Sequence, residues 1–231
     1  MCNNISIKTP NYQLLERQTS LQFPPEHREL YKSYYEVSGF NKPLLPVVST
    51  EAPRELRMYR WSFLPGWVKD PATFKANTLN ARAEELFEKP TYRSYWRNRC
   101  LLVTTGFFEP HEVDYRKQNE SWHVRPKEGE IMYLGCVWSR WGDTNTFSIV
   151  TTEASPLMAH VHNGKNRMPL ILDDEKAEAW LLPDLTKEEM AKLMETPQLD
   201  HTLEAYRVMD GVTNTRLDTN VPEVLVPLQN L

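Results

Sequence analysis

The chain has 231 residues, 40% of them hydrophobic and 25% charged, a composition typical of a soluble globular protein and not of a disordered one. No stretch approaches 18 uninterrupted apolar residues, so we expect no membrane span, and the first residues lack the basic start and apolar core of a secretory signal. The net charge of -4 argues against broad electrostatic wrapping of nucleic acid, although it leaves room for a local basic patch.

Three cysteines, Cys2, Cys100 and Cys136, lie far apart in the sequence. Their spacing gives neither a disulfide framework nor a pair of metal ligands, so a reducing cytoplasm is the expected compartment. Single β-rich domains often reach this length, and we therefore expect one domain over residues 1–231.

The first half of the chain is predicted to mix short helices with strands. A short helix is expected within residues 22–37, where prolines precede apolar residues at a spacing of three to four. Two strands are expected next, at residues 44–49 and 57–63. Residues 81–98 are predicted to be helical, with a break at Pro90.

The second half is predicted to be richer in strands. Residues 100–108 are a strong strand candidate, and further strands are expected at residues 131–137, 147–152, 202–208 and 221–227. Helices are expected at residues 173–182 and 186–195. Because strands occur in runs, with helices between and after them, the pattern predicts an α+β fold with a mainly antiparallel sheet or barrel.

Cys2 is the most informative single residue. Its small side chain favours removal of Met1, which would leave a free α-amine and a thiol on adjacent carbons. Such a 1,2-aminothiol reacts with aldehydes, because the amine forms an imine and the thiol then closes a five-membered thiazolidine ring. An α-amine with an ordinary pKa of about 7.7–8.0 is partly neutral, and so nucleophilic, near pH 7. The alternative interpretation is a chance cysteine at position 2.

Three polar residues lie near the ends of expected elements. Asn80 suits a helix N-cap or, alternatively, an amide that orients the Cys2 terminus or a substrate oxygen. Arg82 could bind a phosphate with two hydrogen bonds or form a surface salt bridge. Glu109 ends an apolar strand, where it is either solvated or a buried general base whose pKa is raised by burial.

Two histidines and a tryptophan complete the candidates. His160 and His162 would share one face if their segment were extended. No third ligand with a motif spacing accompanies them, so a catalytic histidine is favoured and no metal site is predicted. Trp67 follows a Pro-Gly turn, where the ring is either part of the core or exposed to stack on a base or wedge between bases.

Five motifs follow one another along the chain: Met1-Cys2, residues 61–67 (WSFLPGW), residues 79–84 (LNARAE), residues 106–109 (GFFE), and His162 shortly before residues 167–172 (RMPLIL). In this order they resemble the SRAP (SOS response-associated peptidase) family of abasic-site processing proteins, over residues 2 to about 172. The resemblance implies a single α+β domain, built round a mainly antiparallel β-barrel-like sheet with short flanking helices and a basic channel.

The resemblance also implies roles for individual residues. Cys2 would form the thiazolidine with the ring-opened abasic sugar, and Asn80 would hold the reacting terminus. Glu109 would manage protons on the Cys2 amine. His162, preferred over His160 because it lies just before Arg-Met-Pro, would protonate the deoxyribose ring oxygen. The residues with implied DNA contacts are Trp67, Arg82, Thr151 and Arg167.

The implied activity is a covalent DNA–protein crosslink at abasic sites in single-stranded DNA. Strand cleavage by β-elimination and self-processing peptidase activity are implied as side activities. The expected partner is single-stranded DNA, bound by a monomer without any cofactor. The chain departs from the family where Asn3-Asn4 replace a frequent Gly-Arg, and where Pro110 replaces a frequent aromatic residue.

Two other functions are compatible with the same residues. A cysteine-dependent hydrolase would use Cys2 as an N-terminal nucleophile and its own amine as base, and would turn over amide substrates without DNA. A non-catalytic single-strand binding module would use Trp67 and basic residues, and its salt-sensitive binding would survive Cys2→Ala.

Overall fold

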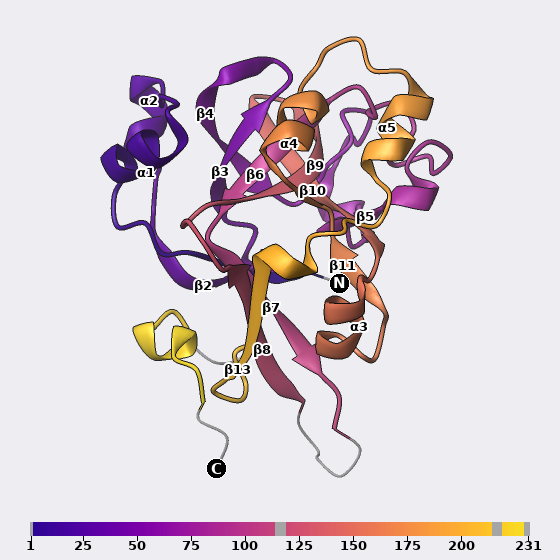
Figure 1. The fold of residues 1–231 in the computed structure, drawn as a ribbon. Helices are drawn as coiled ribbons and strands as arrows, with labels where there is room; N and C mark the ends of the chain where they lie inside the picture. The colour runs from indigo at the N-terminus through magenta and orange to yellow at the C-terminus, as the bar shows by residue number, and fades with distance from the viewer. Residues whose placement is uncertain (1, 114–118, 214–218, 229–231) are drawn as a thin grey trace.

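A computed structural model describes residues 2–113, 119–213 and 219–228, and in these ranges the strands form two sheets (Figure 1). The smaller sheet is antiparallel throughout and has the order β13-β8-β7-β1-β2. Its strands are β1 (Asn4–Ile7), β2 (Tyr34–Ser38), β7 (Gly106–His111), β8 (Glu120–Pro126) and β13 (Leu203–Val208). The first strand of the chain therefore lies between two others, which fixes the backbone that follows Cys2.

The larger sheet closes on itself. Its order is β11-β10-β4-β3-β6-β9-β12, and an additional pairing of β9 with β10 closes a ring of β10, β4, β3, β6 and β9. All its pairings are antiparallel except those of β10 with β4 and β5. The strands are β3 (Leu44–Ser49), β4 (Ala52–Trp61), β5 (Asn80–Arg82), β6 (Arg99–Thr104), β9 (Met132–Trp141), β10 (Thr144–Glu153), β11 (Arg167–Pro169) and β12 (Ile171–Leu172).

The helices are short and lie around the sheets. They are α1 (Tyr12–Thr19), α2 (Pro25–Arg28), α3 (Pro156–Val161), α4 (Asp174–Trp180) and α5 (Lys187–Leu193). Single 3-10 turns occur at Gly39–Asn41, Pro71–Thr73, Ala83–Glu85, Asp200–Thr202 and Pro222–Leu225. Side chains cap most of the α-helices; α5, for example, begins with a capping box between Thr186 and Glu189. Helices this short depend on tertiary contacts for their stability.

The core spans both sheets. Ile5 and Phe107 from the smaller sheet pack in one buried cluster with Leu102 and Phe147 from the larger one. Burying a side chain of this size stabilises the fold by about 1.5–3 kcal/mol. On the other side of β6 and β9, the buried Trp180 of α4 donates its indole N–H to the carbonyl of Cys100 at 3.1 Å, which docks that helix against the ring.

The predicted α+β class with a mainly antiparallel sheet is confirmed. The expected strands at 44–49, 57–63, 131–137, 147–152 and 202–208 correspond to β3, β4, β9, β10 and β13, although β4 begins five residues before the predicted start. The two helices expected at 173–182 and 186–195 are α4 and α5.

Several predicted elements are wrong, and the reasons are tertiary. Within residues 22–37 only one helical turn forms, because the chain then pairs with β1 as β2. Residues 81–98 begin as β5 and continue as turns, since Ala81 pairs with Val150. The expected strand at 100–108 is two strands, β6 and β7, which belong to different sheets. Residues 221–227 contain a 3-10 turn instead of a strand.

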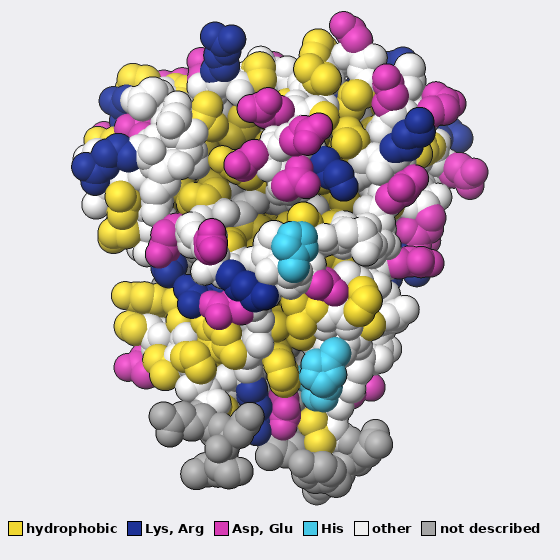
Figure 2. Space-filling model, viewed as in Figure 1, with side chains coloured by type: hydrophobic (Ala, Val, Ile, Leu, Met, Phe, Trp, Pro, Cys, Tyr) yellow, Lys and Arg dark blue, Asp and Glu magenta, His cyan; other side chains and the backbone are white. Residues whose placement is uncertain are grey.

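None of the helices in the described residues is long and apolar enough to cross a membrane. On the face shown in Figure 2, basic and acidic side chains are interspersed, and no continuous basic stripe crosses that face. Any electrostatic attraction for a polyanion must therefore be local there.

Candidate active site and nucleic-acid interface

Cys2 lies two residues before the start of β1 and is completely buried. The register of the smaller sheet, in which Asn4 pairs with Phe108, brings the start of the chain beside Glu109 of β7. Burial raises the pKa of the Cys2 thiol well above its usual value, and the nearby Glu109 carboxylate raises it further. The thiol is therefore protonated at neutral pH, and its environment does not favour a free thiolate.

Glu109 and His162 form a buried pair. One carboxylate oxygen of Glu109 lies 3.1 Å from Nδ1 of His162, and the two side chains are 0% and 3% exposed. Glu109 comes from β7 and His162 caps the C-terminal end of α3. Two elements from distant parts of the chain thus bring together an acid and a base within hydrogen-bonding distance.

Burial shifts the pKa of both members of this pair toward their uncharged forms. It raises the pKa of Glu109 to about 7 and lowers that of His162 to about 4. At neutral pH the imidazole is uncharged, and the carboxyl group holds its proton about half of the time. The contact is then a close approach of two mostly uncharged groups across which a proton can pass, and not a permanent ion pair.

Asn80 lies beside the start of the chain. Its Nδ2 donates to Oδ1 of Asn3 at 3.0 Å, and its backbone carbonyl accepts from the hydroxyl of Tyr92 at 3.2 Å. Its own Oδ1 is buried without a hydrogen-bond partner in the described part of the chain. The N-cap interpretation is wrong, because Asn80 belongs to β5 and the following 3-10 turn begins after Arg82.

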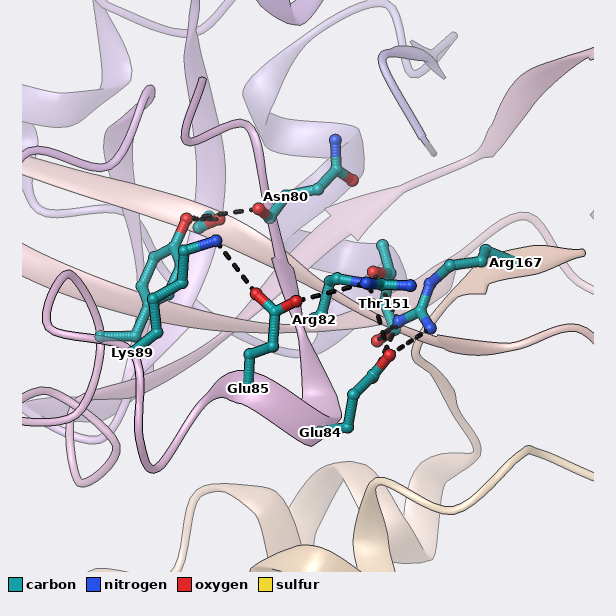
Figure 3. A network of polar contacts seen from close by, with 9 residues as sticks. Asn80, Arg82, Glu84, Glu85, Lys89, Thr151 and Arg167 are labelled. Carbon is teal, nitrogen blue, oxygen red and sulfur yellow. Dashed lines mark hydrogen bonds and ion pairs between the residues drawn. The ribbon is translucent and has the colours of Figure 1, made fainter. Parts of the chain in front are cut away.

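A polar pocket opens next to Asn80 (Figure 3). Its lining is mainly cationic or amide-bearing: Asn77, Asn80, Arg82, Glu85, Lys89, Lys165 and Arg167. Arg82 is half-exposed and contacts Glu84 at 3.3 Å and Glu85 at 3.2 Å. Lys89 also contacts Glu85, at 3.0 Å, so this carboxylate lies between two cations. Exposed ion pairs of this kind are weak and can exchange with a phosphate.

Arg167 and Thr151 are buried and bonded to each other. The Arg167 guanidinium donates to the backbone carbonyl of Thr151 at 2.6 Å and to its hydroxyl at 3.2 Å. It also pairs with Glu84 at 2.6 Å. Arg167 lines the pocket and Thr151 lies behind it as its hydrogen-bond partner, so a direct contact of either residue with DNA stays a prediction.

The remaining candidates lie at the surface. Trp67 is 58% exposed, and its ring meets Phe74 edge-on with the centroids 6.0 Å apart. The condition for a shared face of His160 and His162 is not met, because residues 160–162 form the end of α3 and are not extended. His160 is consequently exposed while His162 is buried. In the described ranges, no three His, Cys, Asp or Glu side chains are grouped to hold a metal ion.

Three further residues of this region escaped the sequence analysis. Asn3 reaches the site through its bond to Asn80, and Lys89 and Lys165 line the pocket. The position of Asn3 directly after Cys2 could have identified it as a residue of this region. Nothing local distinguishes either lysine from the other surface lysines, because only the folded chain brings both beside Arg82.

Fold and site together define an α+β protein with a buried cysteine near its amino terminus, beside an acid–base pair and a cationic pocket. The sequence pattern of one family, SOS response associated peptidase (SRAP), matches residues 1–215. The chain belongs to the SRAP family.

Relatives of known name and structure agree with this assignment. The chain is 28% identical over 231 residues to the abasic site processing protein YoqW of Bacillus subtilis (strain 168), covering 97% of this chain and 99% of YoqW. It is 26% identical over 205 residues to the abasic site processing protein HMCES of Pongo abelii, covering 73% of this chain and 56% of HMCES. A crystal structure of a protein from Bacteroides thetaiotaomicron superposes with a TM-score of 0.87 at 27% identity, covering 99% of this chain and 100% of that one.

Proposed function

We propose that this protein processes abasic sites in single-stranded DNA by forming a covalent bond through Cys2 after removal of Met1. The observation that carries the proposal is the buried Glu109–His162 pair beside Cys2. It occurs in a family whose named relatives YoqW and HMCES are abasic site processing proteins.

The chemistry needs no cofactor. The α-amine of Cys2 adds to the aldehyde of the open abasic sugar, and loss of one water gives an imine. The thiol then adds across the C=N bond, its sulfur bonding to carbon and its proton passing to nitrogen, which closes the thiazolidine. Atoms balance with the release of one water and without any oxidant. Both nucleophiles belong to one residue, so ring closure is intramolecular and favoured.

Glu109 is the proposed proton carrier for these steps. A carboxyl group whose pKa burial raises to about 7 can accept a proton from the Cys2 amine and return it during dehydration. Protons from both the amine and the thiol have to move during the reaction, and the raised pKa of Cys2 makes a base beside the thiol necessary.

His162 is proposed to help open the sugar. An abasic sugar is mostly a closed hemiacetal, so its opening requires a proton at the ring oxygen. The imidazole is uncharged at neutral pH, because burial lowers its pKa to about 4. The proton is therefore proposed to come from the pair: the protonated carboxyl of Glu109 lies 3.1 Å from Nδ1 and can supply it through the ring.

The pocket beside Asn80 is proposed to hold the DNA backbone. Arg82 would exchange its carboxylate partners for a phosphate, and Lys89 and Lys165 would add positive charge. Asn80 would hold the reacting terminus, as it already contacts Asn3. Trp67, with its exposed ring, would stack on or separate bases. Contacts from Thr151 and Arg167 are part of the same proposal.

Two side activities belong to the proposal. An imine at the sugar acidifies the adjacent carbon, so β-elimination can break the strand, with Glu109 as the candidate base. Self-processing that removes Met1 would expose Cys2. A monomeric state and a cytoplasmic location remain expectations from the sequence.

Denaturing gel electrophoresis tests the proposal. The protein, with loss of Met1 verified by mass, is incubated with single-stranded DNA carrying one abasic site. We expect a heat-stable shifted band that is absent with Cys2→Ala and with an undamaged strand. Binding that survives Cys2→Ala but never becomes covalent would favour a single-strand binding module, and turnover of amide substrates without DNA would favour a hydrolase.

A further inference from the structure

His162 lies at the end of a helix that is too short to be stable by itself. The helix that it caps, α3, has six residues, well below the roughly 12–15 that an isolated helix needs to be even marginally stable. Within the described part of the chain, the His162 backbone is bonded locally, its N–H to Met158 and its carbonyl to the N–H groups of Lys165 and Asn166. The His162 side chain is also hydrogen-bonded to the backbone of Arg167. Beyond that bond, the position of His162 relative to Glu109 depends on contacts between α3 and its neighbours.

The residue after His162 makes such a contact. The backbone N–H of Glu112 donates to Oδ1 of Asn163 at 2.8 Å, and Nδ2 of Asn163 donates to the backbone carbonyl of Glu112 at 3.0 Å. One amide thus pairs with both backbone groups of a single residue, as a neighbouring strand would. Glu112 lies three residues beyond Glu109, directly after β7.

A second contact holds the chain on the N-terminal side of His162. Nδ1 of His111, at the end of β7, lies 2.9 Å from the backbone carbonyl of His160. The rings of His111 and His160 also pack on Trp122 of β8, with centroids 5.7 Å and 5.6 Å from that of the indole. Trp122 is the cross-strand partner of Glu109. Residues on both sides of His162 are therefore tied to the strands that carry and adjoin Glu109.

We propose that Asn163 is a positioning residue, whose pairing with the backbone of Glu112 holds the imidazole of His162 at the Glu109 carboxylate. The expected effect of Asn163 on the reaction rate rests on the proposed function. Its expected effect on the position of His162 does not. Asn163 and His111 lie at the surface or partly exposed, so changing either leaves the buried core intact. Proton transfer is steep in distance and angle, so a small displacement of His162 would slow the reaction.

A double-mutant cycle tests the proposal. We expect N163A to slow single-turnover crosslink formation by roughly fivefold to tenfold, since its two hydrogen bonds are each of modest net strength. In an H162Q background, N163A should change the rate by less than twofold, because its effect passes through the imidazole. N163D keeps the shape and the acceptor but loses the donor, and should be intermediate. N145A, which removes an amide bonded to Arg140, is the matched control and should leave the rate unchanged.

An NMR titration of the histidine rings in the free protein gives a readout without DNA. Burial holds the pKa of His162 at about 4, and release of the loop in N163A should move it toward the ordinary 6.5 as water enters. Equal slowing by N163A in both backgrounds, or an unchanged rate together with an unchanged titration, would overturn the positioning role. If wild-type protein forms no crosslink at all, the proposed function fails, and the titration still decides the role of Asn163.

Discussion

Burial of the Glu109 carboxyl links the proposed chemistry to stability. The folded protein holds the proton of Glu109 up to a pKa of about 7, whereas the unfolded chain releases it near 4.5. The contribution of Glu109 to stability is thus fully present below pH 4.5 and is lost as the pH rises through 7. The shift amounts to about 3 kcal/mol, because one pKa unit corresponds to about 1.4 kcal/mol.

Glu109→Gln should therefore act in opposite directions on activity and stability. We expect the crosslinking rate to fall by about 100-fold or more, because the amide cannot carry the proton. The amide cannot ionise either, so the stability of the variant relative to wild type should be greater at pH 8 than at pH 5, by about 2.5 kcal/mol. Urea unfolding at both pH values measures this. The same difference at both pH values would contradict the raised pKa of Glu109.

At the scale of elements, strand β7 links the candidate site to the smaller sheet. It carries Glu109 and lies between β1 and β8 in the smaller sheet. Gly106 begins this strand, and a Cβ there would lie 2.5 Å from Nε2 of His123 and 2.7 Å from the backbone carbonyl of Val124. The carbonyl belongs to the strand ladder and cannot move without shifting β8.

Gly106→Ala should consequently destabilise the fold. Overpacking of this kind costs about 1–3 kcal/mol, and the expected result is a lower unfolding midpoint in urea. Because the displaced strand carries Glu109, crosslinking should slow as well. An unchanged midpoint would show that β7 and β8 accommodate the methyl group, and that their close approach at Gly106 is not required.

Elements whose signal is local were the ones that could be predicted. Residues 131–137 and 147–152 carry apolar β-formers over their whole length, and the structure places them in β9 and β10. Residues 81–98 were wrongly predicted to be helical because their apolar residues have the spacing of a helix. There, pairing of Ala81 with β10 and burial of Tyr92 and Trp96 in the core overrode local propensity.

The candidate site, too, could be predicted from the sequence only in part. Cys2, Glu109 and His162 could be named from motif order, and the fold places Glu109 beside both of the others. The helical end at His162 and the pairing of Asn163 with Glu112 could not be predicted. Both depend on how α3 lies against β7, a contact between segments about 50 residues apart that leaves no periodic trace in the sequence.

At the scale of the whole molecule, the charge distribution sets how DNA can be held. The net charge is -4, and the basic side chains that line one pocket are Arg82, Lys89, Lys165 and the buried Arg167. The face in Figure 2 shows no continuous basic stripe. About three phosphates at most can therefore be neutralised at this pocket by exposed cations.

Reversible binding should accordingly depend only weakly on salt. With Cys2→Ala, which cannot close the thiazolidine, the logarithm of the affinity for single-stranded DNA should fall with the logarithm of salt concentration with a slope of about -2. Fluorescence anisotropy across a salt series measures this. A slope of about -5 or steeper would reveal a far more extensive basic contact surface than the pocket provides.

The covalent bond at Cys2 is tested most directly by the intact mass of the crosslinked species, before and after borohydride treatment. The account predicts a mass equal to protein without Met1 plus abasic DNA, less one water, with the DNA mapped to Cys2. Borohydride should leave that mass unchanged, because a thiazolidine has no C=N bond to reduce. A gain of two hydrogens would show an imine without ring closure, and attachment at any other residue would contradict the role of Cys2.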